Sequence, residues 1–504
     1  MWSSLAQFDT PATTRNNFGG LADLTDPADA TRAVLAARRR SPDRHDHGRQ
    51  PVTREGRHLL GEVVLTLTDQ LTHRSWPDTV AVHFSNHDLK GKGEALWPHL
   101  GLIPPNLEVA VPYRALLPRG VDGLLVTGKA LSATHDALPA LRMQADLENL
   151  GAITGLAASL CVRGGLRPRD LDPAVLRKLI AETAPPGLLP DYDPGDAAAS
   201  PLELPAALRE VQRRLPLHSY SDMGRRQVFR GRVPFVDLVL DPGPETTEAL
   251  LRALPGAAGP ARLVLAQILV CRGEPAGADL LVGHLTAVLA GPALPPRDSG
   301  IREAQLPPDQ AAMPAPVYLL HTLALARDPR AVSLWERVGT LVEVTEDSLR
   351  DPLAGTFYWV EAVAAGAERL GDPAALPVLR ALRSRPALQA QWRHSGVEAD
   401  DFQERRAILE LALARAIAQC GGEDGVAALA AYAADNRAPL AAQARTRLRL
   451  LREAGGAAAV ACPSARPLPW SADPYRADLP PGFVPGRRPA WTGPESESGP
   501  EVGE

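Results

Sequence analysis

The segment from Val111 to Leu160 constrains the fold more than any other part of the chain. Within it, the apolar run Val121–Val126 (VDGLLV) has the composition of a buried β-strand. The run ends in Thr-Gly-Lys at 127–129, where a glycine allows the backbone to approach a ligand closely. A polar loop follows, and from about Pro139 apolar residues recur at helical spacing. We therefore expect a strand, a ligand-facing loop and a helix.

The helix expected after Pro139 carries Gly151 and Gly155, one turn apart on one face. Such a pair of small residues allows something to pack closely against the helix. Two interpretations stay open: a seam between this helix and a strand, or the close approach of a cofactor.

Three motifs in this part of the chain belong together. They are the VPYR strand at Val111–Arg114, the strand and loop at Val121–His135, and the glycine-containing helix at Arg142–Ala158. Together they resemble the carboxyl-terminal part of the FAD-dependent oxidoreductase family that is related to the flavin subunit of heterodisulfide reductases. Upstream, Arg54–Glu62 is similar to the family's Arg-Glu-Ser-Arg-Arg…Gly-Glu segment, with Gly56 where a Ser is common.

The resemblance implies FAD as the cofactor, with the loop and the start of the helix against the flavin ring and pyrophosphate. A lysine in the loop could neutralise the pyrophosphate or stabilise the reduced flavin, although it could also be a solvated loop residue. An arginine at the start of a helix opposes the helix dipole, which favours a ligand there. The residues expected to contact FAD are Thr127, Gly128, Lys129, Ala130, Leu131, Ser132, Thr134, Arg142, Met143, Gly151 and Gly155.

The G-x-G-x-x-G turn that opens a dinucleotide-binding domain is absent from this sequence. Gly91-Lys92-Gly93 lacks the third glycine, and Gly19-Gly20 follows no apolar strand. The resemblance covers about residues 1–195 and only the second half of a flavin domain. We therefore expect a truncated chain, a missing half supplied by another polypeptide, or a chain that has lost FAD.

Two His-Asp pairs adjoin the expected site. His87 with Asp88, and His135 with Asp136, could handle the proton that accompanies hydride transfer, because an imidazole titrates near neutral pH. The alternative is surface polar sequence. A metal site built from His83, His87 and Asp88 is not expected, because the strand predicted at 80–84 would scatter these ligands.

An anionic substrate is the expected ligand of three arginines, Arg54, Arg57 and Arg114, because clustered guanidinium groups bind anions. Structural salt bridges are the alternative for all three. Lysine is rare, with 4 among the 54 basic residues, so a lone arginine carries little information here.

Composition narrows the class of protein. With 504 residues, 45% apolar content and a net charge of −5, the chain can build two or three cores and has no basic bias toward nucleic acid. No signal peptide and no apolar run of membrane-spanning length is visible, so we expect a cytoplasmic protein without a membrane partner. The 4 cysteines lack C-x-x-C spacing, which argues against disulfides and an iron–sulfur cluster.

Beyond about Pro244 the sequence predicts ten short Ala/Leu-rich helices, from Thr246–Leu254 to Leu440–Glu453. They repeat a helix, a Gly/Asp/Pro turn and an Ala-Leu-rich helix, a pattern that resembles HEAT-like repeats. We expect an α/β part, consisting of a partial FAD/NAD(P)-binding-type domain with an added mixed sheet, followed by an all-α HEAT-like solenoid. The expected divisions are a polar, partly disordered segment at 1–50, the partial oxidoreductase domain at 51–195, a connector at 196–243, the helical repeats at 244–455 and a disordered Pro-rich tail at 456–504.

The function expected from these features is FAD-dependent hydride or electron transfer to a small organic substrate. Two alternatives stay open. One is a non-catalytic interaction protein, in which the repeats bind a protein partner and the flavin region is vestigial. The other is one subunit of a split flavoenzyme.

Overall fold

The computed structural model describes a little over two thirds of the chain, in separate stretches. Arg54, Arg57, His87, Asp88 and Cys462, on which predictions above rest, lie outside the described residues. So do the tail at 456–504 and most of the segment at 1–50. The described residues are 3–4, 26–40, 52–53, 58–85, 96–100, 107–184, 187–191, 203–213, 229–297, 313–351, 354–393 and 401–453.

The amino-terminal region combines short strands with helices of very different length. Its strands are β1 (Ser3–Ser4), β2 (Val52–Thr53), β3 (Thr79–Ser85) and β4 (Leu107–Pro112). Its α-helices are α1 (Pro27–Arg40), α2 (Leu67–Leu71), α3 (Leu96–Leu100), α4 (Gln144–Gly164) and α5 (Pro173–Thr183). Single 3₁₀ turns lie at Tyr113–Leu116 (η1), Gly128–Ala130 (η2), Leu138–Ala140 (η3) and Pro168–Asp170 (η4).

Strands β3 and β4 form an antiparallel pair in which His83 lies opposite Val109. Every residue of β4 is buried, because helices cover the pair. Helix α5 begins with two residues that favour a helix start: Asp172 accepts a hydrogen bond from the Ala174 N–H, and Pro173 occupies the first helical position. In the described residues the sheets are two antiparallel pairs, with one antiparallel and two parallel isolated bridges, and the expected mixed sheet does not form there.

The strand expected at Val121–Val126 is not a strand in the structure. Val121 is 50% exposed and Leu124 is 48% exposed. A backbone bond from the Val126 N–H to the Leu116 carbonyl ties down one end of the run. A β-strand needs a neighbouring strand to pair its backbone groups along its whole length, and the described residues place none beside 121–125.

The carboxyl-terminal region is helical, and all ten helices expected from its sequence are present. Three further helices were not expected: α6 and α7 in the predicted connector, and α13. The α-helices are α6 (Leu204–Arg213), α7 (Pro234–Leu240), α8 (Pro244–Ala253), α9 (Gly259–Cys271), α10 (Pro275–Leu289), α11 (Ala315–Ala326), α12 (Ala331–Leu341), α13 (Glu346–Arg350), α14 (Thr356–Leu370), α15 (Leu376–Arg383), α16 (Asp401–Gln419), α17 (Glu423–Ala433) and α18 (Ala438–Glu453).

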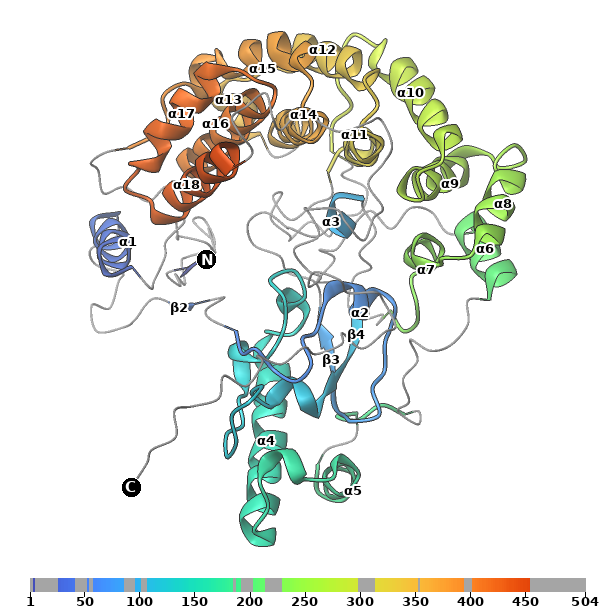
Figure 1. Ribbon diagram of the computed structural model, residues 1–504, viewed down its shortest axis with the longest axis vertical. Coiled ribbons are helices and arrows are strands. Elements are labelled where there is room, and N and C mark those ends of the chain that lie inside the picture. The colour runs from blue at the N-terminus through green and yellow to red at the C-terminus, as the bar shows by residue number, and fades with distance from the viewer. Residues whose placement is uncertain are drawn as a thin grey trace, which may run out of the picture.

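These helices follow one another around an arc (Figure 1). Helices α9, α11, α14 and α16 lie along its inner side, and α10, α12, α15 and α17 along its outer side. Each inner helix packs against its neighbours in the row and against an outer helix, as α16 does with α14 and α17. The arrangement is that of stacked helical layers, whereas assignment to HEAT repeats stays a prediction.

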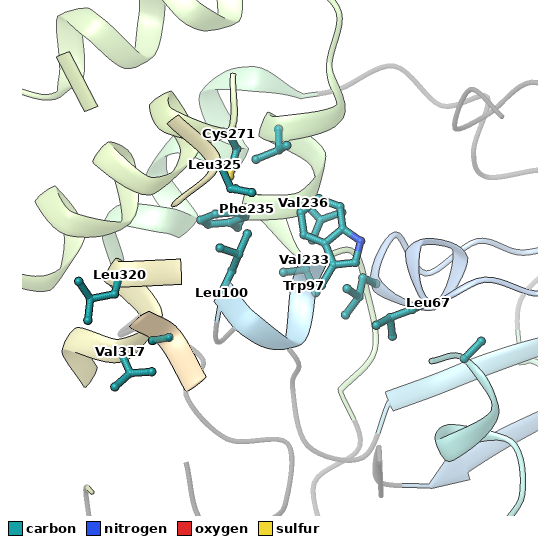
Figure 2. Packing of buried hydrophobic residues seen from close by; sticks show 14 of the residues in the cluster. Leu67, Trp97, Leu100, Val233, Phe235, Val236, Cys271, Val317, Leu320 and Leu325 are labelled. Atoms are coloured by element: carbon teal, nitrogen blue, oxygen red, sulfur yellow. The ribbon is translucent and has the colours of Figure 1, made fainter. Parts of the chain in front are cut away.

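Helix α3 joins the two regions. It lies on the inner side of the arc beside α11 (Figure 1). Trp97 and Leu100 on α3 are buried together with Val233, Phe235 and Val236 of α7 and its start (Figure 2). One hydrophobic cluster runs from Leu65 to Cys420 without a break at the predicted domain boundary.

The segment before α7 adds backbone contacts to this junction. The Val233 N–H donates to the Leu71 carbonyl over 2.8 Å, and the Glu108 N–H donates to the Phe229 carbonyl over 3.1 Å. The domain boundaries predicted from sequence stay predictions. The apolar core and these hydrogen bonds nevertheless join residues on the two sides of the boundary predicted near residue 195.

Candidate functional site

The loop at 127–134, predicted to contact FAD, is held on two sides by backbone hydrogen bonds. The Leu59 N–H donates to the Ala130 carbonyl at 2.8 Å, and the Leu65 N–H donates to the Ser132 carbonyl at 3.0 Å. On the other side, the Ser132 N–H donates to the Ala115 carbonyl at 3.1 Å. The loop is therefore fixed between the segment at 58–65 and the turn that follows β4.

Side chains reinforce this position. The Ser132 hydroxyl accepts the Gly61 N–H at 3.0 Å, and His58 Nδ1 lies 2.7 Å from the Ala133 carbonyl oxygen. Gly61 sits so close to the loop that a Cβ atom there would lie 2.7 Å from Ser132 Cβ. Only glycine fits at that position without moving the loop.

The loop presents one accessible edge. Thr127 is exposed, and Gly128, Lys129 and Ala130 are half-buried. Gly128 has a φ of +77°, a conformation that favours glycine and sets the turn into η2. Leu131 and Ser132 are fully buried, so their side chains serve the core and not this edge.

Thr134 closes the loop. Its N–H donates to the Leu65 carbonyl at 2.9 Å. Its hydroxyl is buried and has no hydrogen-bond partner among the described residues. A buried hydroxyl without a partner is costly, and such groups often mark a place that a ligand or water fills.

Helix α4 follows the loop and carries the remaining residues expected to contact FAD. Met143 is its N-cap, and Arg142 is 8% exposed. Gly151 and Gly155 face open space: a Cβ atom at either would meet no atom of the described residues within 4 Å. In the part of the chain that the structure describes, no strand therefore packs against this glycine pair.

Of the residues expected to handle protons or to bind substrate, the structure describes only some. His135 is half-buried beside the loop, and Asp136 is fully buried. The guanidinium of Arg114 forms a two-point ion pair with Asp78, at 2.7 and 2.9 Å. Arg114 thus has the structural role that was its alternative, and its role in substrate binding stays a prediction.

His83, considered above only as part of a metal site that the sequence did not favour, has an unusual environment. Its side chain is 1% exposed on β3, and neither ring nitrogen has a hydrogen-bond partner among the described residues. Burial lowers the pKa of His83, and the charge of Asp146 in the first turn of α4 opposes that shift. The alternation of side chains along a strand indicates from sequence alone that His83 shares a face of β3 with Ala81. The sequence carries no signal, however, that the ring nitrogens of His83 lack polar partners.

Other kinds of site find no support. The described residues contain no group of three or more His, Cys, Asp or Glu side chains placed to hold a metal ion. The described cysteines, Cys161, Cys271 and Cys420, are buried and form no disulfide. None of the described helices has the length and apolar content needed to cross a membrane.

Comparison with known families supports the flavin interpretation of this region. Residues 27–180 match the family model described as FAD dependent oxidoreductase. No curated protein and no solved structure matches the chain. The chain therefore contains an FAD-dependent oxidoreductase family domain over residues 27–180, and that family implies FAD as the cofactor.

Proposed function

We propose that this chain is an FAD-dependent oxidoreductase that transfers hydride or electrons to a small organic substrate. The observation that carries the proposal is the matched region at 27–180, whose loop at 127–134 is rigidly held with one accessible edge. When bound, FAD supplies the redox chemistry that amino-acid side chains lack.

The accessible edge and helix α4 offer groups that suit one side of an FAD molecule. Lys129 and Arg142 supply positive charge for a phosphate or for the electron-rich edge of a reduced flavin. The orphaned hydroxyl of Thr134 offers a hydrogen bond. Gly151 and Gly155 leave the surface of α4 open to a flat ring.

The first half of a dinucleotide site, which opens with a G-x-G-x-x-G turn, is not formed by these residues, because the sequence has no such turn. Residues 121–124 are exposed and pair with no strand of the described residues, and Val121 and Leu124 expose apolar surface there, where a further strand could pack. We propose that a dinucleotide-binding unit on another polypeptide completes the site, as in a split flavoenzyme.

A non-catalytic interaction protein is the second candidate. The missing glycine turn favours it, because loss of the pyrophosphate contacts would remove several kcal/mol of binding energy. In that case the arc of helices binds a protein partner, and the loop at 127–134 is a remnant.

A titration of the full chain with FAD separates the candidates. We expect weak but saturable quenching of flavin fluorescence, weak because the pyrophosphate lacks its turn. Gly155→Val should abolish the quenching, since a branched side chain would fill the open face of α4.

Gly283→Val is the matched control. Gly283 lies on α10 with no atom within 4 Å of a Cβ, so this variant carries the same helix penalty far from the loop. Saturable binding that Gly155→Val removes and Gly283→Val retains would support the oxidoreductase. If the unmodified chain showed no saturable binding at any FAD concentration, the interaction protein would be favoured instead.

A further inference from the structure

The buried imidazole of His83 is the strongest unexplained polar group in the described residues. A neutral imidazole carries one donor and one acceptor, and burial without partners is unfavourable for both. Both ring nitrogens of His83 are buried without a hydrogen-bond partner among the described residues, and the residue is 1% exposed. An apolar side chain of similar size would fit the same place without this penalty, so stability alone does not explain a histidine here.

The position of His83 connects it with the proposed flavin site. Strand β3 packs against α4, and Asp146, the residue of α4 whose charge acts on His83, is itself buried. Asp146 lies in the first turn of α4, three residues after Met143. A change of charge at the start of α4 is therefore felt at His83 in a region with little water to screen it.

Several other charged groups lie around β3, and some of them are turned to different partners or to solvent. The parts of the chain packed against β3 are β4, α4, α5, η3 and the segment at 187–191. Of these, η3 has no ionisable side chain, and Asp191 is exposed. Buried Arg142 and Asp136 lie in the loop before α4. Glu108 on β4 bonds to His73 and Arg230. The others are Arg177, which donates to the Pro77 carbonyl, buried Cys161, and the exposed Glu148, Arg163, Lys178 and Glu182.

We propose that His83 is a positioning residue of the flavin site, which takes up a proton when FAD binds and so balances the cofactor's negative charge through the first turn of α4. The proton comes from solvent, and no bond of the cofactor changes. This inference rests on the proposed function.

The sign of the effect follows from electrostatics. An anion that arrives near the start of α4 raises the pKa of His83 relative to the cofactor-free chain. Proton uptake then accompanies binding, and affinity increases as pH falls. The window begins below the ordinary imidazole value of about 6.5, because burial lowers the pKa of His83 in the free chain, and it extends up to the raised pKa in the complex. One linked proton changes the dissociation constant by at most about tenfold per pH unit.

The test is isothermal titration of the full chain with FAD, at pH values on both sides of this window and in two buffers of different ionisation enthalpy. We expect up to about one proton taken up by the unmodified chain in the window. His83→Gln should bind FAD with no uptake and a flat pH profile. Asp146→Asn should shift the window, since it removes the charge that acts on His83. His284→Gln, on α10, is the matched control and should behave as the unmodified chain.

His83→Leu provides a second variant in case glutamine impairs folding, because leucine removes the orphaned polar atoms. Equal proton uptake in the unmodified chain and in the His83 variants would overturn the inference while leaving FAD binding intact. Absence of FAD binding to the unmodified chain would contradict the proposed function, and the inference with it.

Discussion

Trp97 donates its indole N–H to the hydroxyl of Thr68 over 3.0 Å, and both residues are buried. The bond joins α3, which enters the arc, to α2 in the region that matches the oxidoreductase family. The ring of Trp97 lies beside Val233 and Val236 (Figure 2), so one side chain contacts both parts of the chain.

Thr68→Val should therefore destabilise the chain by about 1–3 kcal/mol, the cost of leaving a buried indole N–H without its acceptor. Trp97→Phe removes the indole N–H donor, so that in this background Thr68→Val should no longer leave a buried donor without an acceptor. Urea unfolding of the two single variants and the double variant measures the coupling between them. Strictly additive effects would mean that the hydrogen bond contributes nothing.

Removal of the helical region should damage the remaining part. A chain that ends near Pro201 loses the partners of Trp97 and Leu100 and the backbone bonds to Val233 and Phe229. We expect it to aggregate or to bind a hydrophobic dye, whereas a chain that ends at residue 455 should fold like the full one. A soluble, cooperatively unfolding piece ending near Pro201 would show that the two parts are independent domains.

Gly61→Ala should displace the loop at 127–134, because the new Cβ would lie 2.7 Å from Ser132 Cβ. We expect a loss of about 1–3 kcal/mol in stability and weaker FAD binding. Ser132→Gly in the same chain makes room for the Cβ and should restore part of both losses. The measurements are thermal unfolding and flavin fluorescence. A Gly61→Ala variant with unchanged stability and unchanged FAD binding would contradict this geometry.

Lys129→Ala should leave FAD bound but make its reduction harder, since a cation near the flavin stabilises the reduced form. For a partly exposed charge worth about 1 kcal/mol, a two-electron potential should fall by about 20 mV. Potentiometric titration measures it, with the exposed Lys178 on α5 as the control position. An identical potential would remove Lys129 from the site.

Stability should fall on mild acidification because of His83. Its folded-state pKa lies below the unfolded value of about 6.5, so the unfolded chain binds more protons as pH drops through that value. The stability contributed by neutral His83 is present above this range and is lost below it. His83→Leu should flatten the melting temperature between about pH 7 and 5 relative to the unmodified chain. A steeper dependence in the variant would show that another group is responsible.

Secondary structure was predictable from sequence where it depends on residues that are close together in the chain. Asp172 and Pro173 fix the start of α5, and apolar periodicity located ten of the helices of the arc. The run at Val121–Val126 misled the interpretation, because its apolar composition does not reveal whether a neighbouring strand exists. Helix α3 is only five residues long, too short to show a period, although it makes the main contact between the two regions.

The candidate site was predictable to a similar degree. The motif spacing located the loop and the helix that follows, but not which loop residues turn inward, as Leu131 and Ser132 do. That choice is set by the segment at 58–65, which is distant in the sequence. The isolation of His83 also arises from packing between β3 and α4, which no local pattern encodes.

The ion pair between Arg230 and Glu108 spans 122 residues of sequence, and the bridge between Leu107 and Phe229 has the same separation. During synthesis at about 5–20 residues per second, β4 leaves the ribosome roughly ten seconds before the segment that covers its edge. Over that interval the nascent chain presents an unpaired strand edge and the apolar face that later receives Trp97 and Phe235. Early folding of this protein should therefore be slow and depend on chaperones, because the junction cannot form until the segment that carries Val233 and Phe235 has been made.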